Sequence, residues 1–255
     1  MIALIGSGNV ATWVASKLAG SKEFAIGQVY SRNLDHARAL ADRVGVEAID
    51  DLRKLNPACD VFLFALRDDA YPDILKEVPF RMPLALHTAG SVSQHIFKQY
   101  ADAYGVVYPL QTFSKTMDFS AVKVPLCVES DCLGGNQDKV MRLVAELSDM
   151  HCEMTEKQRA VAHLAAVFAC NFSNALCGIA DELLQQEGFS LELLMPLMEQ
   201  TLDKLKTMSP AEAQTGPAAR RDTVVMGKQI QDLKNEQWQE IYRVVSDYII
   251  SKIEE

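Results

Sequence analysis

A glycine-rich turn near the first residue constrains the fold of this chain more than any other feature of its sequence. The apolar run 2–5 has strand character, and the segment 6–11, GSGNVA, leads into Val14 and Leu18 at helical spacing. The order strand, glycine turn, helix predicts a dinucleotide-binding fold with the pyrophosphate at the helix N-terminus. An ordinary strand-to-helix turn that required glycine is the alternative.

Each position of the turn has an expected task. Gly6 makes the tight bend, and Gly8 has no Cβ to keep a pyrophosphate away from the backbone. We therefore expect Gly6, Ser7, Gly8, Asn9 and Val10 to contact the cofactor.

The second junction indicates which cofactor binds. The strand expected over 24–30 is followed by Ser31, Arg32 and Asn33. Folds that prefer NAD place an acid here to bind the ribose 2′-hydroxyl, whereas an arginine matches a 2′-phosphate in shape and charge. Ser31 and Arg32 therefore predict NADP, with a solvated surface arginine as the alternative.

The next strands supply further candidates at their carboxyl ends. The near-continuous apolar run 60–66 is typical of a strand covered on both faces of a parallel sheet. Ligands collect at such strand ends, so Ala65, Leu66 and Arg67 are expected beside the nicotinamide half of the cofactor.

The strand expected over 84–87 ends in a polar loop that contains a glycine. We expect His87 and Thr88 to border the cofactor on the substrate side, and Ser91 to contact the substrate. A strand end with a capping serine is the alternative reading of this loop. A strand over 106–113 then places Gln111 just beyond its proline.

A change in composition predicts two domains. A helix over 140–150 and a short strand over 152–154 are expected to close a doubly wound α/β sheet, so the first domain spans 1–154. Residues 155–255 have helical patterns throughout and predict an all-α domain. Its alanine-rich segment 156–187 predicts a long, mostly buried helix.

Three polar residues of this helix are candidates for the substrate side. At 100° per residue, His163 and Asn174 fall near one line, and Asn171 lies about 80° from His163. His163 is the candidate for proton transfer because histidine titrates near neutral pH. Buried polar groups that hydrogen-bond to neighbouring helices are the alternative.

Bulk properties exclude several classes of protein. The net charge of −9 argues against a nucleic-acid partner, which needs a basic face. The six cysteines show neither CxxC pairs nor metal-ligand spacing, so we expect no metal site and reduced thiols in the cytoplasm. The sequence shows no leader pattern and no apolar run judged long enough to cross a membrane, so no membrane partner is expected.

Several motifs in this order resemble a known family. They are residues 5–11 (IGSGNVA), 87–91 (HTAGS), 109–113 (PLQTF), 163–174 (HLAAVFACNFSN) and 215–222 (TGPAARRD). Together they resemble the Rossmann-like NADP-dependent oxidoreductases that carry a C-terminal helical domain of uncharacterised type. More distant similarity extends to the 6-phosphogluconate dehydrogenase, ketopantoate reductase, pyrroline-5-carboxylate reductase, prephenate dehydrogenase and deazaflavin-dependent NADP oxidoreductase families.

The resemblance implies an enzyme that moves a hydride between NADP and a small carbonyl, imine or hydroxy compound held in a cleft between the domains. In such an enzyme, His163 would transfer a proton, and the substrate would be oriented by Ser91, Gln111 and Asn171. It also implies a helical domain like that of 6-phosphogluconate dehydrogenase.

One departure from the family favours a second hypothesis. Similar sequences often have histidine where this chain has Tyr108. A non-catalytic NADP-binding sensor or scaffold is therefore the alternative function.

The apolar stripes of the helical domain predict a homodimer. The stripes over 193–205 and 238–249 add to the long alanine-rich helix, and a bundle of this size cannot cover all three alone. Related families commonly pair through this domain. The loop 215–222 is the segment expected near the partner's cleft.

Overall fold

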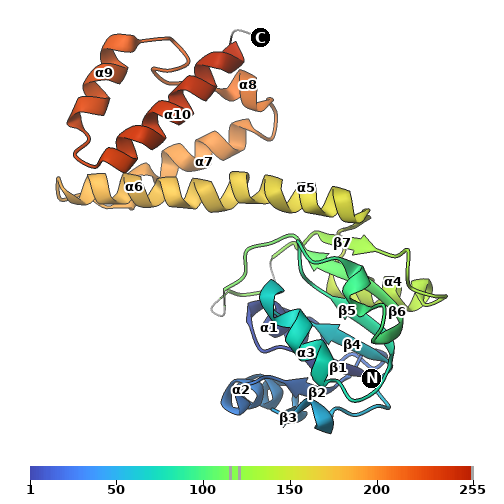
Figure 1. Ribbon diagram of the computed structural model, residues 1–255. Helices are drawn as coiled ribbons and strands as arrows, with labels where there is room; N and C mark the ends of the chain where they lie inside the picture. The colour runs from blue at the N-terminus through green and yellow to red at the C-terminus, as the bar shows by residue number, and fades with distance from the viewer. Residues whose placement is uncertain (115–116, 120–121, 254–255) are drawn as a thin grey trace. The chain divides into compact units, whose positions relative to one another are not determined.

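Eight strands form one sheet, in the order β3-β2-β1-β4-β5-β6-β7-β8 (Figure 1). The computed structural model describes residues 1–114, 117–119 and 122–253. All neighbouring strands are parallel except β6 and β7, which are antiparallel. The strands are β1 (Ile2–Ile5), β2 (Ile26–Tyr30), β3 (Glu47–Ile49), β4 (Val61–Phe64), β5 (Met82–His87), β6 (Ala101–Pro109), β7 (Leu126–Glu129) and β8 (His151–Glu153).

Alternation along the strands builds two cores, one on each face of the sheet. In β1, Ile2 and Leu4 belong to one core, while Ala3 and Ile5 belong to the other. The first core is covered by α1 (Asn9–Leu18), α2 (Leu34–Val44) and α4 (Gln137–Leu147). The second is covered by α3 (Tyr71–Glu77) and short 3₁₀ turns. This confirms the predicted doubly wound α/β domain.

The order of the strands defines the edge where ligands bind in such folds. β1 lies in the middle of the sheet: β2 and β3 follow on one side of it, and β4 and β5 follow on the other side. The carboxyl ends of β1, β2, β4 and β5 therefore meet at one edge of the sheet, where the connections diverge. The glycine turn follows the first of these strands.

The chain divides into two compact units, residues 1–168 and 169–255, which we describe separately. The division falls inside a long helix rather than between residues 154 and 155. This helix comprises α5 (Glu156–Ala166), a π-helical segment (Val167–Phe172) and α6 (Ser173–Gln185). α5 belongs to the first unit because its first turns bond to the loop after β5 and to the end of β7.

The expectation of a mostly buried helix is wrong. In α5 only Arg159 is buried, and α6 has no buried residue. The sequence reasoning also missed that Glu156–Gln185 is, by length and composition, apolar enough to cross a membrane. Core helices of soluble proteins and signal sequences pass the same test, so this helix carries no conclusion about a membrane.

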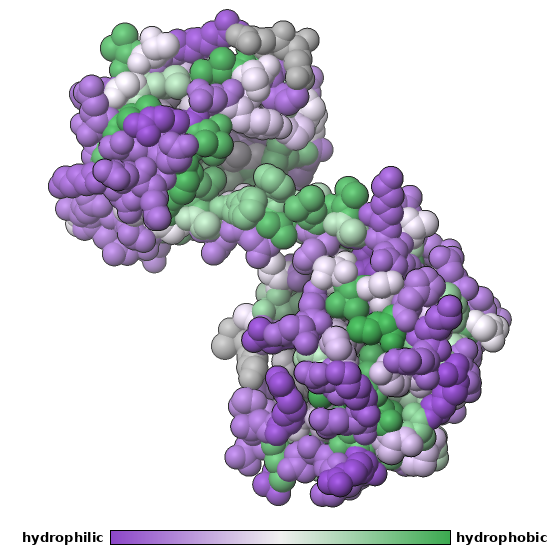
Figure 2. Space-filling view, viewed as in Figure 1, coloured by the Kyte–Doolittle hydropathy of each residue, from purple (hydrophilic) through white to green (hydrophobic). Residues whose placement is uncertain are grey.

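The second unit is helical, as predicted. It contains α6, α7 (Met195–Lys204), α8 (Pro210–Ala213), α9 (Thr223–Asp232) and α10 (Glu236–Ile253). In the loop before α9, Arg221 adopts a left-handed conformation (φ 54°), and Asp222 caps the helix by accepting from the Val225 N–H. Hydrophobic residues gather along the long helix on the face seen in Figure 2.

Candidate functional site

The glycine turn has the geometry that a pyrophosphate requires. Gly6 has φ +127°, and a Cβ at this position would collide with the backbone carbonyl of Ala65, so only glycine fits. A Cβ built on Gly8 meets no atom of the described residues within 4 Å, so these residues leave open space above the backbone. Gly8 is the N-cap of α1, with no side-chain cap and no acid in the first turn. The open, positively polarised helix end fits the pyrophosphate of NADP.

The residues around the turn are joined to two other segments. The Ser7 hydroxyl donates to the Ser31 hydroxyl at 3.0 Å, which connects the turn to the end of β2. Asn9 instead donates its amide to the Phe113 carbonyl at 2.6 Å. Ser7 and Ser31 therefore lie together as expected, whereas the Asn9 side chain holds the loop after β6 against α1.

Arg32 and Arg67 line one cavity of about 590 Å³ beyond the ends of β2 and β4. Arg67 forms an exposed ion pair with Asp69 at 3.1 Å. The sequence reasoning assigned Arg67 to the nicotinamide half, but the structure brings it to the cavity of Arg32, the residue expected at the 2′-phosphate. Ala65 and Leu66, which precede Arg67, are partly buried at the end of β4.

His87 and Thr88 cannot serve as the cofactor contacts that the sequence predicted. His87 is fully buried, its Nδ1 accepts from the Ala89 N–H at 3.2 Å, and its ring packs on Tyr71 and Phe97. Burial, followed by the charge of Arg159, lowers the pKa of His87 to about 3. The Thr88 hydroxyl is directed into the sheet and donates to the Phe64 carbonyl. Both residues complete the second core.

Tyr108 and His163 form a hydrogen-bonded pair. The Tyr108 hydroxyl lies 2.8 Å from His163 Nδ1, and the two rings meet edge to face. Tyr108 comes from β6 and His163 from α5, so the pair joins the sheet to the helix within the first unit. Burial, then the neighbouring Cys127, raises the pKa of Tyr108 to about 12, so this phenol keeps its proton at neutral pH.

Gly90 is what permits this pair to lie against the loop after β5. A Cβ on Gly90 would lie 2.7 Å from His163 Nδ1 and 3.0 Å from Tyr108 Cζ. The next residue, Ser91, donates to the carboxylate of Asp68, which follows β4. Ser91 therefore follows directly after Gly90, the loop residue against which the His163 ring of α5 lies.

The remaining predicted substrate contacts are not part of this group. Gln111 is bound within its own loop, since its Oε1 accepts from the Thr112 N–H and its Nε2 donates to the Lys123 carbonyl. Asn171 lies in the π-helical segment, in the second unit. The even 100° spacing that related it to His163 does not hold through this wider turn.

The sequence reasoning missed two charged residues behind the pair. Arg159 and Glu129 form an ion pair at 2.8 Å, and each is only 1% exposed. The signal available in the sequence was one arginine in the first turns of an alanine-rich segment, four residues before His163. A charge in such surroundings needs a buried partner.

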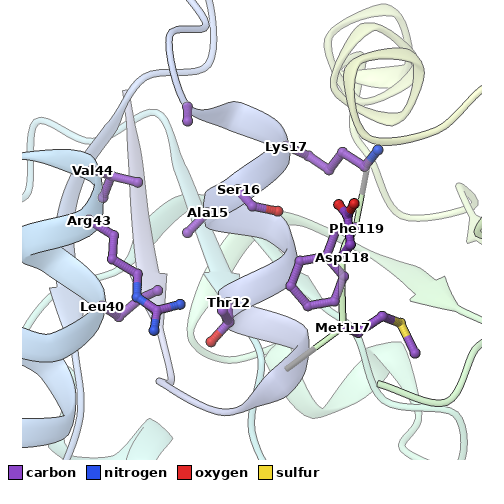
Figure 3. Close-up of a pocket in the computed structure, with 11 residues that line it drawn as sticks. Thr12, Ala15, Ser16, Lys17, Leu40, Arg43, Val44, Met117, Asp118 and Phe119 are labelled. Atoms are coloured by element: carbon purple, nitrogen blue, oxygen red, sulfur yellow. The ribbon is translucent and has the colours of Figure 1, made fainter. Parts of the chain in front are cut away.

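A separate cavity of about 640 Å³ lies between α1, α2 and residues 117–119 (Figure 3). It borders the later turns of α1, whereas the glycine turn precedes the first, and none of the predicted site residues lines it. In the part of the chain that the structure describes, no group of three His, Cys, Asp or Glu residues could hold a metal ion.

Comparisons with known proteins agree with this geometry. Residues 1–86 match the family described as NADP oxidoreductase, coenzyme F420-dependent, and residues 124–249 match a domain of unknown function, DUF2520. A Bacteroides fragilis protein provisionally assigned as an NADP oxidoreductase is 34% identical, with a TM-score of 0.88; the match covers 98% of this chain and 97% of that one. Comparison with curated proteins finds no match.

Two more distant solved structures share the fold. One is a pyrroline-5-carboxylate reductase from Coxiella burnetii, 16% identical, with a TM-score of 0.58 over 99% of this chain and 97% of that one. The other is an imine reductase from Myxococcus stipitatus in complex with NADP⁺, 16% identical, with a TM-score of 0.60 over 100% of this chain and 93% of that one.

Proposed function

Because the chain belongs to the family of NADP oxidoreductases that includes the Bacteroides fragilis protein, we propose that it transfers a hydride between NADP(H) and a small carbonyl, imine or hydroxy compound. It is an NADP-dependent enzyme of the reductase type, as membership of this family establishes. The sensor or scaffold alternative rested on Tyr108, and the hydrogen bond of this residue with His163 gives Tyr108 a role in the proposed reaction.

The hydrogen bond between Tyr108 and His163 is the observation that carries the proposal. NADPH, when bound, supplies the hydride, so the protein must supply one proton to the substrate oxygen or nitrogen. Tyr108 keeps its proton and can donate it to Nδ1 of His163, and in that tautomer the imidazole carries its own proton on Nε2. As Nε2 gives its proton to the substrate, Nδ1 can take the hydroxyl proton of Tyr108, so the imidazole stays neutral. His163 is half-buried, and its Nε2 makes no hydrogen bond with the described residues, so this nitrogen is available to the substrate.

Other residues have supporting tasks in this proposal. The Gly8 turn receives the pyrophosphate, and Arg32 with Arg67 binds the 2′-phosphate. Ser91, fixed by Asp68, orients the substrate next to the imidazole. Asn171 is retained as a candidate substrate contact, while Gln111 would have to leave its loop to act.

The experiment measures NADPH oxidation by purified protein with a panel of small substrates. The two distant structures are of a pyrroline-5-carboxylate reductase and an imine reductase, so the panel begins with the imine 1-pyrroline and continues with cyclohexanone and pyruvate. Replacing His163 by Asn should lower kcat by roughly 10²–10⁴-fold with little change in NADPH affinity. Tyr108→Phe, which removes only the hydroxyl, should lower kcat with an unchanged fold. A His163→Asn enzyme with normal kcat would contradict the proposal.

We also propose that two copies pair through the helical unit. Large hydrophobic side chains are exposed on α6, α9 and α10, among them Leu176, Leu183, Val224, Val244, Val245 and Tyr248. An apolar cavity of about 380 Å³ lies within this unit, lined by residues of α6 and α10 around Trp238. Large contiguous apolar patches are rare on monomers, and an obligate interface typically buries roughly 2,000 Å² or more. Light scattering behind a sizing column should give the dimer mass, and a monomer mass at micromolar concentration would contradict it.

A further inference from the structure

We propose that Arg159 is a positioning residue for the Tyr108–His163 pair. Its guanidinium holds the loop 89–92 so that Gly90 lies against the imidazole of His163. The inference rests on the function proposed above for His163. It assigns a task in that reaction to a buried arginine that acts through the loop and the imidazole.

Arg159 donates four hydrogen bonds to described residues, and three of them go to one loop. Nη1 donates to the carbonyls of Ala89 at 3.0 Å and Gly90 at 2.6 Å, and Nη2 donates to that of Val92 at 2.8 Å. The fourth, from Nε, goes to Oε2 of Glu129 at 2.9 Å, and Nη2 forms an ion pair with the same oxygen at 2.8 Å. Lysine has only three donors on a single nitrogen, so no other side chain could make this set of contacts.

The loop meets α5 at three successive levels. Glu156 accepts from the Ser93 hydroxyl at 2.7 Å, Arg159 binds the carbonyls, and His163 contacts Gly90. Positions 156, 159 and 163 are spaced by three and four residues, so their side chains share one face of a regular α-helix. Arg159 is the central and strongest of these attachments, one turn before His163.

The direction of the loop follows from these contacts. The carbonyls of Ala89, Gly90 and Val92 converge on one guanidinium, and the Cα of Gly90 faces the imidazole. A loop held from the carbonyl side cannot move away from His163 without breaking charge-assisted bonds. The position of the imidazole relative to Tyr108 is therefore fixed by an arginine on its own helix.

The cost of this arrangement supports a task beyond stability. Arg159 and Glu129 are each only 1% exposed, so both charges have lost their hydration. A protein in which well-packed apolar residues replace such a buried ion pair is often as stable as the original. Among the described residues, Glu129 Oε1 has no hydrogen-bond partner, and burial is the main cause of the raised pKa of the Glu129 carboxyl group. What an apolar pair could not provide is the orientation of three carbonyl groups.

Two variants separate positioning from stability. Arg159→Lys keeps the charge opposite Glu129 but cannot reach all three carbonyls. The double variant Arg159→Met with Glu129→Leu removes both buried charges and leaves the carbonyls unheld. The matched control is Arg142→Lys, because Arg142 forms an exposed ion pair with Glu23 at 2.7 Å far from the loop in sequence.

The primary readout does not depend on activity. The ¹⁵N chemical shift of His163 Nδ1 reports its hydrogen bond with Tyr108, and kcat and KM are measured with NADPH and 1-pyrroline. In whichever of the two variants unfolds cooperatively, we expect the Nδ1 shift to move toward that of a free imidazole. We also expect kcat to fall at least tenfold, with KM for NADPH within twofold of the original.

Arg142→Lys should change neither quantity. An unchanged Nδ1 shift and kcat in a cooperatively folded Arg159→Lys or double variant would overturn the inference, since a merely structural arginine predicts that result. A normal kcat in His163→Asn would instead overturn the proposed function, while the Nδ1 shift in Arg159→Lys still decides the positioning.

Discussion

Replacing Gly90 by alanine tests the geometry of the Tyr108–His163 pair directly. The added Cβ would lie 2.7 Å from Nδ1 and 2.8 Å from Cγ of His163, and 3.0 Å from Cζ of Tyr108, whereas ordinary contacts begin at 3.4 Å. Gly90 has no positive φ, so the substitution brings no backbone strain and acts only through this collision.

The size of the effect follows from the displacement required. The imidazole must move by roughly 0.5–1 Å, which stretches its 2.8 Å bond with the Tyr108 hydroxyl beyond normal hydrogen-bonding distance. A misplacement of this order costs about 10²-fold in rate when a reacting group is involved. Overpacking costs typically 1–3 kcal/mol of unfolding free energy, out of a total of roughly 5–15 kcal/mol, so the protein should still fold.

The assay compares kcat, NADPH affinity and thermal unfolding with those of a matched variant. Gly27→Ala in β2 creates a similar collision, at 2.5 Å from Met1 Sδ, but with a flexible and exposed side chain. We expect Gly90→Ala to lose about 10²-fold in kcat with normal NADPH affinity, and Gly27→Ala to keep its kcat. A Gly90→Ala enzyme with unchanged turnover would show that the contact between Tyr108 and His163 is not needed.

Three further predictions concern the cofactor site and the core. Arg32→Ala should weaken NADPH binding by about tenfold to a hundredfold and leave NADH binding unchanged, and Arg67→Ala should have the same effect to a smaller extent. Titration calorimetry with both cofactors tests this, and an equal loss of affinity for NADPH and NADH would contradict a 2′-phosphate site. Gly6→Ala should destabilise the fold, because Gly6 has a φ of +127° and the added Cβ would collide with the Ala65 carbonyl. Gly8→Ala should instead keep the melting temperature within a few degrees and lower the affinity for NADPH. Scanning calorimetry measures the first effect and titration with NADPH the second. Burial lowers the pKa of His87 from 6.5 to about 3, so the folded state holds this imidazole in its neutral form. The resulting contribution to the free energy of unfolding is fully present above pH 6.5 and is lost as the pH falls toward 3, by up to about 1.4 kcal/mol per pH unit. Urea unfolding across this range should be less acid-sensitive in His87→Phe, and parallel pH profiles would contradict the assignment.

The parts of the fold that were predictable from sequence are those with a local signature. The strands β1 and β4 are buried on both faces, which produces the apolar runs 2–5 and 60–66. β6 was expected over 106–113 but spans Ala101–Pro109. Gly105 lies inside it because a side chain there would meet the Glu129 carbonyl at 2.7 Å, a close approach that single-sequence reasoning takes for a break.

The residues of the site also separate into those with a local sequence signature and those without one. The glycine turn and the absence of an acid after β2 are local, so the sequence revealed them. The pairs Tyr108–His163 and Glu129–Arg159 join positions 55 and 30 residues apart, and only the packing of α5 on the sheet brings them together. His87 was placed at the correct strand end, but alternation along the strand turns its ring into the core, and this direction depends on the register of β5.

The two outermost strands of the sheet have a consequence for how the protein behaves at high concentration. β3 and β8 are only three residues long, and each carries an exposed glutamate, Glu47 or Glu153. Longer and flatter outer strands would offer unpaired N–H and C=O groups as a template for intermolecular sheet growth. These two offer little such template and add negative charge beside it. Aggregation of the intact fold through added strands is therefore opposed at both ends of the sheet, so any self-association of the folded protein must use other surfaces.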